Sequence, residues 1–179
     1  NADKDQKRSF KREVFSWIAC IVVTILLTEF ILNFVIINAN IPSGSMENTI
    51  MTNDKLIALR TSYWFNDPKR GDIIIFKYPD DETEWFIKRV IALPGETVLV
   101  KDGKVYINGS KKALSEPYIK EEPVEDFGPY KVPKNGYFVM GDNRNNSNDA
   151  REWETHYVSR DEVLGKAWFR YYPSIKVIK

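Results

Sequence analysis

Residues 14–37 read VFSWIACIVVTILLTEFILNFVII, an apolar run in which Glu29 is the only charged residue. A helix needs roughly 20 apolar residues to cross a bilayer core of about 30 Å, and this run is long enough. Its polar residues are mild and scattered, whereas a helix at the edge of a soluble core would gather them on one face. The run therefore predicts a transmembrane anchor over residues 14–36.

The residues before this run indicate how the anchor is oriented. The basic ones among them are Lys4, Lys7, Arg8, Lys11 and Arg12. Positive charge tends to stay in the cytoplasm, which predicts a cytoplasmic basic tail over residues 1–13 and an outer location for the chain after about residue 37. Glu29 would cost about 2.5–3.5 kcal/mol at mid-bilayer, so we expect it near the outer interface. A cleaved signal peptide is the alternative, but its apolar part is about 7–15 residues long and ends in small residues, unlike Asn38-Ala39-Asn40.

Composition excludes several function classes. The formal net charge is +1, so nothing in the charge balance indicates nucleic acid as a partner. Cys20 is the only cysteine and lies in the apolar run, where it acts as a small hydrophobic residue and cannot form a disulfide within the chain. Asp80-Asp81-Glu82 is expected to be a solvated loop, and without clustered His or Cys we expect no metal site and no cofactor. The oligomeric state is left open.

After Ser45 the pattern changes to short runs rich in Val, Ile, Phe, Tyr and Trp, separated by turn residues. These runs predict a mostly-β domain over residues 37–179, with a short turn near residues 159–162. Asp102-Gly103 is a strong signal for a two-residue hairpin. The segment 110–135 is rich in Lys, Glu and Pro and is expected to be a small variable insertion outside the main sheet. The predicted strands are residues 55–60, 72–78, 85–93, 97–101, 104–108, 137–140 and 163–172.

The run IPSGSM at residues 41–46 follows the anchor directly and places one serine hydroxyl on each side of Gly44. An ordinary polar turn is one interpretation. The other is a serine nucleophile, which requires a base to take its proton. His156 is the only histidine and would have to serve a Ser-His-Asp triad, although a histidine beside Trp and Tyr is more often a surface or packing residue. Lysine, as in the Ser-Lys variants of this chemistry, is the remaining base.

Lys88 is the lysine whose neighbours favour that role. Strand alternation puts Phe86, Lys88, Val90 and Ala92 on one face, which is an apolar face carrying one amine. Burial disfavours the charged amine and lowers its pKa. A base that works at neutral pH needs a pKa about 3 units below the ordinary value of ~10.4. The alternative is that Lys88 lies at a strand edge and its amine reaches solvent.

The run GDNRNNSNDAR at residues 141–151 is too polar for a strand and dense in groups that hydrogen bond to one another. It superficially resembles a calcium loop, but Arg144 stands where an oxygen ligand is required. By itself it also fits a hydrophilic surface turn.

Several of these segments, in this order behind the anchor, resemble those of bacterial type I signal peptidases. They are PSGSM at 42–46, RGDIIIF at 70–76, IKRVIALPG at 87–95 and the polar run at 141–151. The resemblance covers most of the chain from the anchor to Arg151. It implies a β-rich catalytic core with a small β insertion, behind an N-terminal transmembrane helix. It also implies a membrane-anchored Ser-Lys endopeptidase that removes signal peptides from exported preproteins at Ala-x-Ala sites on the outer membrane surface.

The resemblance also implies residue roles. Ser45 matches the nucleophile and Lys88 the general base, with the Ser43 hydroxyl and the Ser45 backbone N–H as the oxyanion hole. Ser147 is similar to the hydroxyl that positions the lysine amine. The charged residues that hold the polar run in place correspond to Asp142, Arg144, Asp149 and Arg151. The shallow pockets for small side chains correspond to Ile41, Pro42, Met46, Ile50, Phe86 and Ile87.

The chain departs from the family pattern at positions that do not transfer protons. Asn48 stands where proline is usual, Ala92 where glycine is common, Glu96 where aspartate is usual and Ala150 where serine is common. The expected partners are preproteins and membrane lipid. Two other functions stay open: a membrane-tethered β domain that only binds export substrates or a partner, and a self-cleaving Ser-Lys protease of related fold.

Overall fold

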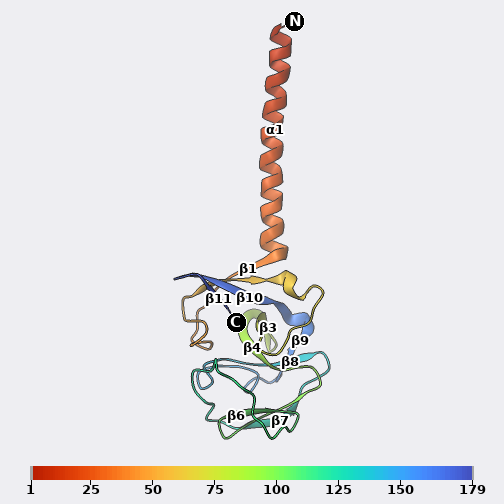
Figure 1. Cartoon of the computed structure of the whole chain (residues 1–179). Coiled ribbons are helices and arrows are strands. Elements are labelled where there is room, and N and C mark those ends of the chain that lie inside the picture. The colour runs from red at the N-terminus through yellow and green to blue at the C-terminus, as the bar shows by residue number, and fades with distance from the viewer. Residues whose placement is uncertain (1, 179) are drawn as a thin grey trace.

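A long N-terminal helix projects away from a β-rich domain (Figure 1). The computed structural model describes residues 2–178, and side chains from residue 10 onward. Helix α1 (Ala2–Phe30) continues into a π-helical stretch, η1 (Ile31–Val35), and then into strand β1 (Ile36–Asn40). Within the described residues, one helix, Phe10–Val35, is long and apolar enough to cross a membrane.

The predicted basic tail is part of the same helix, because α1 already begins at Ala2. The side chains of Lys4, Lys7 and Arg8 lie outside the described residues. From Phe10 to Phe34 the large apolar side chains are mostly exposed, as the surface of a helix in lipid would be. Glu29 accepts a hydrogen bond from the Asn33 amide at 3.0 Å, which satisfies part of this carboxylate within the helix.

The main sheet contains eight strands, and every pairing between them is antiparallel. Their order is β1-β2-β10-β3-β4-β8-β9, and β11 pairs with β10. The prediction of a mostly-β domain behind one N-terminal helix is confirmed. The strands after β1 are β2 (Lys55–Leu59), β3 (Ile73–Tyr78), β4 (Asp81–Ala92), β8 (Gly136–Met140), β9 (Val158–Ser159), β10 (Val163–Tyr172) and β11 (Lys176–Val177).

A second, three-stranded sheet lies at the end of the domain far from the helix (Figure 1). It consists of β5 (Thr97–Lys101), β6 (Lys104–Ile107) and β7 (Phe127–Lys131), in the order β6-β5-β7. Asp102 and Gly103 both have positive φ, 50° and 73°, as the predicted two-residue hairpin requires.

Each strand predicted from the sequence is present, with ends shifted by up to four residues. The predicted short turn near residues 159–162 is the 3-10 helix η3 (Arg160–Glu162), which has a capping box between Ser159 and Glu162. Another 3-10 helix, η2 (Arg60–Tyr63), follows β2. The sequence predicted a loop at Asp81-Glu82, but the backbone there is already part of β4, which begins at Asp81. The two side chains are exposed, as predicted. Strands β1, β7, β9 and β11 were not predicted.

The segment expected to be an insertion, residues 110–135, divides into two parts. Its second part contains β7, which pairs with β5 and completes the small sheet. Its first part is irregular and reaches the loop that follows β8, where Glu121 bridges to Asn143 and the Lys120 N–H donates to the Asp142 carbonyl oxygen at 2.9 Å. This contact brings the segment beside the polar run at 141–151.

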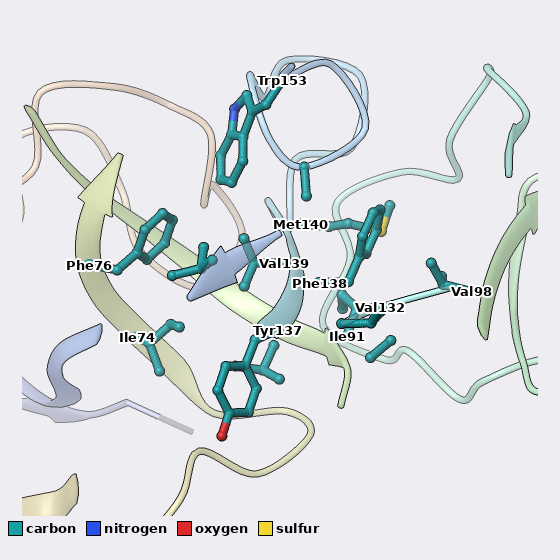
Figure 2. Close-up of a cluster of buried hydrophobic side chains, with 14 of the residues drawn as sticks. Ile74, Phe76, Ile91, Val98, Val132, Tyr137, Phe138, Val139, Met140 and Trp153 are labelled. Atoms are coloured by element: carbon teal, nitrogen blue, oxygen red, sulfur yellow. The ribbon is translucent and has the colours of Figure 1, made fainter. Parts of the chain in front are cut away.

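Apolar side chains cover both faces of β3, which explains why its sequence, IIIFKY, begins with a continuous apolar run. Ile74 and Phe76 belong to a large core that extends to Val98 on the small sheet and to Phe138 (Figure 2). Ile73 and Ile75 belong to a second core that joins the main sheet to the segment after β1. The two cores fix β3, and β3 in turn fixes the register of β4 beside it. The second core comprises Ile37, Ile41, Met46, Ile50, Leu56, Ala58, Ile73, Ile75 and Ala167.

Candidate active site

Ser45 lies in a tight turn that is fixed from beneath by apolar side chains. Ile41 enters the turn paired to Asp54 and Asn53 through backbone hydrogen bonds of 3.0 and 2.8 Å. Met46 and Ile50 are fully buried in the second core, and the Ile50 N–H donates to the Met46 carbonyl oxygen at 2.8 Å. The turn therefore holds Ser45, which is 6% exposed, in one position.

Lys88 reaches the Ser45 hydroxyl from β4. Its Nζ donates to Ser45 Oγ at 2.8 Å, and the side chain is only 4% exposed. Pairing of Lys88 with Ile74 of β3 sets its register, and the Phe86 ring lies 5.2 Å from its Nζ. The amine is thus buried against an aromatic face rather than extended into solvent.

Burial lowers the pKa of Lys88 to about 8, and the Asp149 carboxylate opposes this shift. The charged amine loses its hydration in this position, so the neutral form is favoured. A substantial fraction of Lys88 is therefore neutral slightly above neutral pH, and a neutral amine can accept a proton.

Ser43 and Ser147 line the same cavity as this pair. Ser43 Oγ is 3.5 Å from Ser45 Oγ. Ser147 Oγ is buried, lines the same cavity as Ser45 and Lys88, and has no hydrogen-bond partner within the described part of the chain. Gly141 permits this close packing, since a Cβ there would overlap Ser147 Oγ and the Ser45 carbonyl oxygen.

The polar run 141–151 is a buried network rather than a hydrophilic surface turn. Asp142 accepts hydrogen bonds from Arg89 Nε and Nη2 at 2.8 and 2.7 Å, and both side chains are almost completely buried. Asp149 accepts from the Gly141 N–H at 2.9 Å and from Arg151 Nε at 2.8 Å. The loop also holds the backbone of Ser45, because the Asn143 N–H donates to the Ser45 carbonyl oxygen at 3.0 Å.

Sequence reasoning missed one member of this network, Glu116. The carboxylate of Glu116 accepts from Arg144 Nη1 and Nη2 at 3.0 and 2.6 Å, and both side chains are buried. A count of charge gives the only signal that could have found it. Arg89 and Arg144, which are buried, and Arg151, which is partly buried, are three cations of this network, whereas the polar run supplies two carboxylates. Because buried charges need partners, a third carboxylate had to come from elsewhere.

A cavity of about 700 Å³ opens at the Ser45 and Lys88 pair. A smaller cavity of about 250 Å³ adjoins it along β1, and Pro42, Phe86 and Ile87 line both. Ile41 lines the smaller cavity. Met46 and Ile50, which the resemblance assigned to the pockets, lie in the core beneath the turn and line neither. The lining residues that sequence reasoning missed include Ala39, Ile75, Trp85, Asn146 and Asn148.

His156 takes no part in this arrangement. Its ring lies against the edges or faces of Phe127 and Tyr130, with centroid distances of 5.2 and 5.3 Å. Its Nδ1 is 2.8 Å from the Ala150 carbonyl oxygen, and His156 lines neither cavity. The histidine therefore packs in an aromatic cluster, as its Trp and Tyr neighbours in the sequence suggested.

Comparison with known proteins matches this chain to signal peptidases. The family model "Signal peptidase, peptidase S26" matches residues 14–172. "Probable signal peptidase I-2" of Synechocystis is 44% identical over 161 residues, covering 87% of this chain and 72% of the relative. "Signal peptidase I T" of Bacillus subtilis is 36% identical over 183 residues, covering 97% of this chain and 92% of the relative. A solved signal peptidase I from Enterococcus faecalis is 36% identical, has a TM-score of 0.49, and covers 56% of this chain and 97% of that one.

The family match spans the β-rich domain, the Ser45 turn, β4 and the polar run. The two relatives, 44% and 36% identical, align with 87% and 97% of this chain. The chain therefore belongs to the signal peptidase family, peptidase S26, and is a serine endopeptidase with signal peptidase I function.

Proposed function

We propose that Ser45 and Lys88 form the catalytic dyad with which this chain removes signal peptides at Ala-x-Ala sites. The observation that carries the proposal is the 2.8 Å contact between Lys88 Nζ and Ser45 Oγ, made by an amine whose pKa burial lowers to about 8. A base with a pKa near the working pH is the most effective proton acceptor. Lys88 fits this role by both its position and its pKa.

In the proposed mechanism, neutral Lys88 takes the Ser45 proton as Ser45 Oγ attacks the scissile carbonyl carbon. The lysine then gives that proton to the departing amine, so the peptide bond breaks and an acyl-enzyme remains. A water molecule then attacks this ester and gives a proton to the same amine, which passes that proton to Ser45 Oγ as the acyl group leaves. The Ser43 hydroxyl and the Ser45 N–H are the proposed donors to the oxyanion, each contributing roughly 3–4 kcal/mol. The Ser147 hydroxyl, which is buried and lines the same cavity, is the group that we propose orients the amine.

The substrate is proposed to bind as an extended strand between β1 and the first half of β4. β1 is an edge strand, and β8 pairs with β4 only from Arg89 onward, so both segments have unpaired backbone groups. An extended chain can pair with such edges while alternate side chains enter the pockets. The adjoining cavity is small and lined mainly by apolar residues, which favours alanine-sized side chains.

Cleavage of a purified preprotein tests this proposal. We expect the detergent-solubilised chain to release one mature product, whose new N-terminus follows the second alanine of an Ala-x-Ala site. Replacing that alanine with leucine should lower kcat/KM at least about 100-fold, because overfilling a small pocket costs several kcal/mol. N-terminal sequencing and initial rates provide the measurements. Binding without any cleavage would support the binding-only function instead, and cutting within the chain itself would support self-cleavage.

We further propose that the helix Phe10–Val35 anchors the domain in the membrane with residues 1–13 in the cytoplasm and residues 37–179 on the outer side. The apolar exposed surface of the helix and the basic residues before it support this orientation. Anchoring places enzyme and membrane-bound substrate on one surface and raises their effective concentration.

Protease protection tests this topology. Protease added to spheroplasts that contain the chain should digest the β domain, whereas sealed inside-out vesicles should protect it. Immunoblotting with an antibody to the β domain measures the outcome. Digestion in inside-out vesicles with protection in spheroplasts would reverse the proposed orientation.

A further inference from the structure

Residues 116–122, here named the bracing segment, cross behind the catalytic turn and contact each element that places a proposed catalytic group. The segment lines neither of the two cavities at Ser45. Because of these contacts, we propose that Glu116 is a positioning residue: it holds Arg144, and through Arg144 the loop that sets the Ser45 and Lys88 geometry. This inference rests on the proposed function of that pair.

Glu116 and Arg144 form a buried ion pair. Arg144 is fully buried, and the Glu116 side chain is 6% exposed. The guanidinium gives both Nη atoms to the carboxylate, which also accepts a hydrogen bond from the Tyr118 hydroxyl at 3.0 Å. A bidentate pair of this kind fixes the orientation of the arginine as well as its charge. No carboxylate of the polar run pairs with Arg144 among the described residues.

Arg144 in turn contacts the loop that holds Ser45. With its Nη atoms held by Glu116, Arg144 donates from Nε to the Gly141 carbonyl oxygen at 3.0 Å. Gly141 is the residue whose missing side chain lets Ser147 and the Ser45 carbonyl pack together. The same loop holds Ser45 through the Asn143 N–H at 3.0 Å. A shift of Arg144 therefore displaces Gly141 and, through this loop, the backbone of Ser45, whose hydroxyl contacts Lys88 Nζ.

The rest of the bracing segment ties the same elements together independently. The Tyr118 ring lies 3.9 Å from the Arg89 guanidinium, which holds Asp142. Asn48, which belongs to the Ser45 turn, donates from its side-chain amide to the carbonyl oxygens of Tyr118 and Ile119 at 2.9 and 3.3 Å. Asn48 is one of the positions where the chain departs from the family pattern. The segment thus joins the turn, β4 and the loop at one point.

The test compares Glu116→Gln with Glu125→Gln, a matched change at an exposed position nine residues along the chain and outside the bracing segment. We expect Glu116→Gln to lower kcat about 10- to 100-fold with KM changed less than about threefold, because misplacing reacting groups slows the chemical step while the cavity lining stays intact. Glu125→Gln should match the wild type. Preprotein cleavage provides the rates, corrected for the folded fraction by near-ultraviolet circular dichroism. Wild-type kcat in Glu116→Gln would overturn the proposal.

A double variant shows whether Glu116 acts through Arg144. In the Arg144→Met background, Glu116→Gln should produce no further loss of kcat, since the interaction it supports is already absent. An equal loss in both backgrounds would contradict the positioning role. If Glu116→Gln does not fold, Glu116→Asp keeps the charge but shortens the reach, and we expect an intermediate loss of kcat.

Amide hydrogen exchange separates this proposal from the proposed function. In Glu116→Gln, the Asn143 amide, which is hydrogen bonded to Ser45, should exchange at least about tenfold faster than in Glu125→Gln. This measurement needs no activity. Unchanged exchange would overturn the positioning role while leaving the catalytic dyad in place, whereas the absence of cleavage by the wild type would overturn the dyad and not the brace.

Discussion

Replacing Lys88 with methionine is expected to lower kcat for preprotein cleavage about 10³- to 10⁴-fold, because it removes the only base in contact with Ser45 Oγ among the described residues. Methionine has a similar length and is apolar, so it can fill the space beside Phe86 without the amine. Initial rates at saturating preprotein measure the loss. The Ser45 turn, which has its own apolar support from Met46 and Ile50, should stay folded.

Two further variants make this result specific. Lys88→Arg keeps a cation of similar reach, but a guanidinium does not lose its proton in proteins, so we expect activity as low as in Lys88→Met. Lys77→Met, on neighbouring β3, removes a lysine whose salt bridge with Glu82 is exposed, and it should retain wild-type kcat. Substantial cleavage by Lys88→Arg would show that residue 88 supplies charge rather than proton transfer.

The pKa of Lys88 also predicts the pH dependence of activity and stability. Activity of the wild type should rise as the pH increases through about 8, where the amine becomes neutral. The folded pKa is below the ordinary value for lysine, so the folded state disfavours the protonated form and is penalised at lower pH. This penalty disappears as the pH rises from about 8 to about 10.5. At pH 7 it amounts to about 3 kcal/mol, offset by about 1 kcal/mol from the hydrogen bond that Lys88 makes.

Lys88→Met should therefore be more stable than the wild type at pH 7 by about 2 kcal/mol. Its midpoint of thermal unfolding should be several degrees higher, and the difference should shrink as the pH approaches 10. Lower stability of Lys88→Met at pH 7 would mean that the amine is not held in a desolvated site. A catalytic group that costs stability is a common feature of active sites.

Local sequence patterns predicted the strand that carries Lys88, because period-two alternation depends on neighbouring residues alone. The same patterns could not show that Lys88 meets Ser45, which lies 43 residues earlier in the chain. The resemblance to a family suggested that pairing from the order of the motifs. The same resemblance assigned Met46 and Ile50 to the substrate pockets. In the structure, both side chains lie in the second core.

The missed strands have physical reasons. β1 continues the apolar composition of the anchor, so the change from helix to strand at Ile36 depends on pairing with β2, where Ile37 lies opposite Ala58. β7 contains Gly128 and Pro129, which weaken any strand signal, and it is held by pairing with distant β5. β9 and β11 are two residues long, too short for alternation to register.

Replacing Arg89 with methionine is expected to lower the free energy of unfolding by about 3–5 kcal/mol, the largest loss of stability that we predict for a single substitution in this chain. The Arg89 and Asp142 side chains are 2% and 0% exposed, so removing the guanidinium leaves a buried carboxylate without its cation. The exposed Lys77 and Glu82 pair provides the contrast, and Lys77→Met should cost less than about 1 kcal/mol.

Unfolding in detergent micelles can be followed by intrinsic tryptophan fluorescence, to which Trp153, buried in the large core, contributes. If Arg89→Met unfolds like Lys77→Met, the buried pair does not support the loop. The double variant Arg89→Met/Asp142→Leu distinguishes charge from packing. Removing both charges should recover most of the lost stability, because a buried pair contributes little beyond what apolar residues of similar size provide. The recovered fold should nevertheless cleave slowly, since Asp142 no longer ties the Gly141 loop to the strand that carries Lys88.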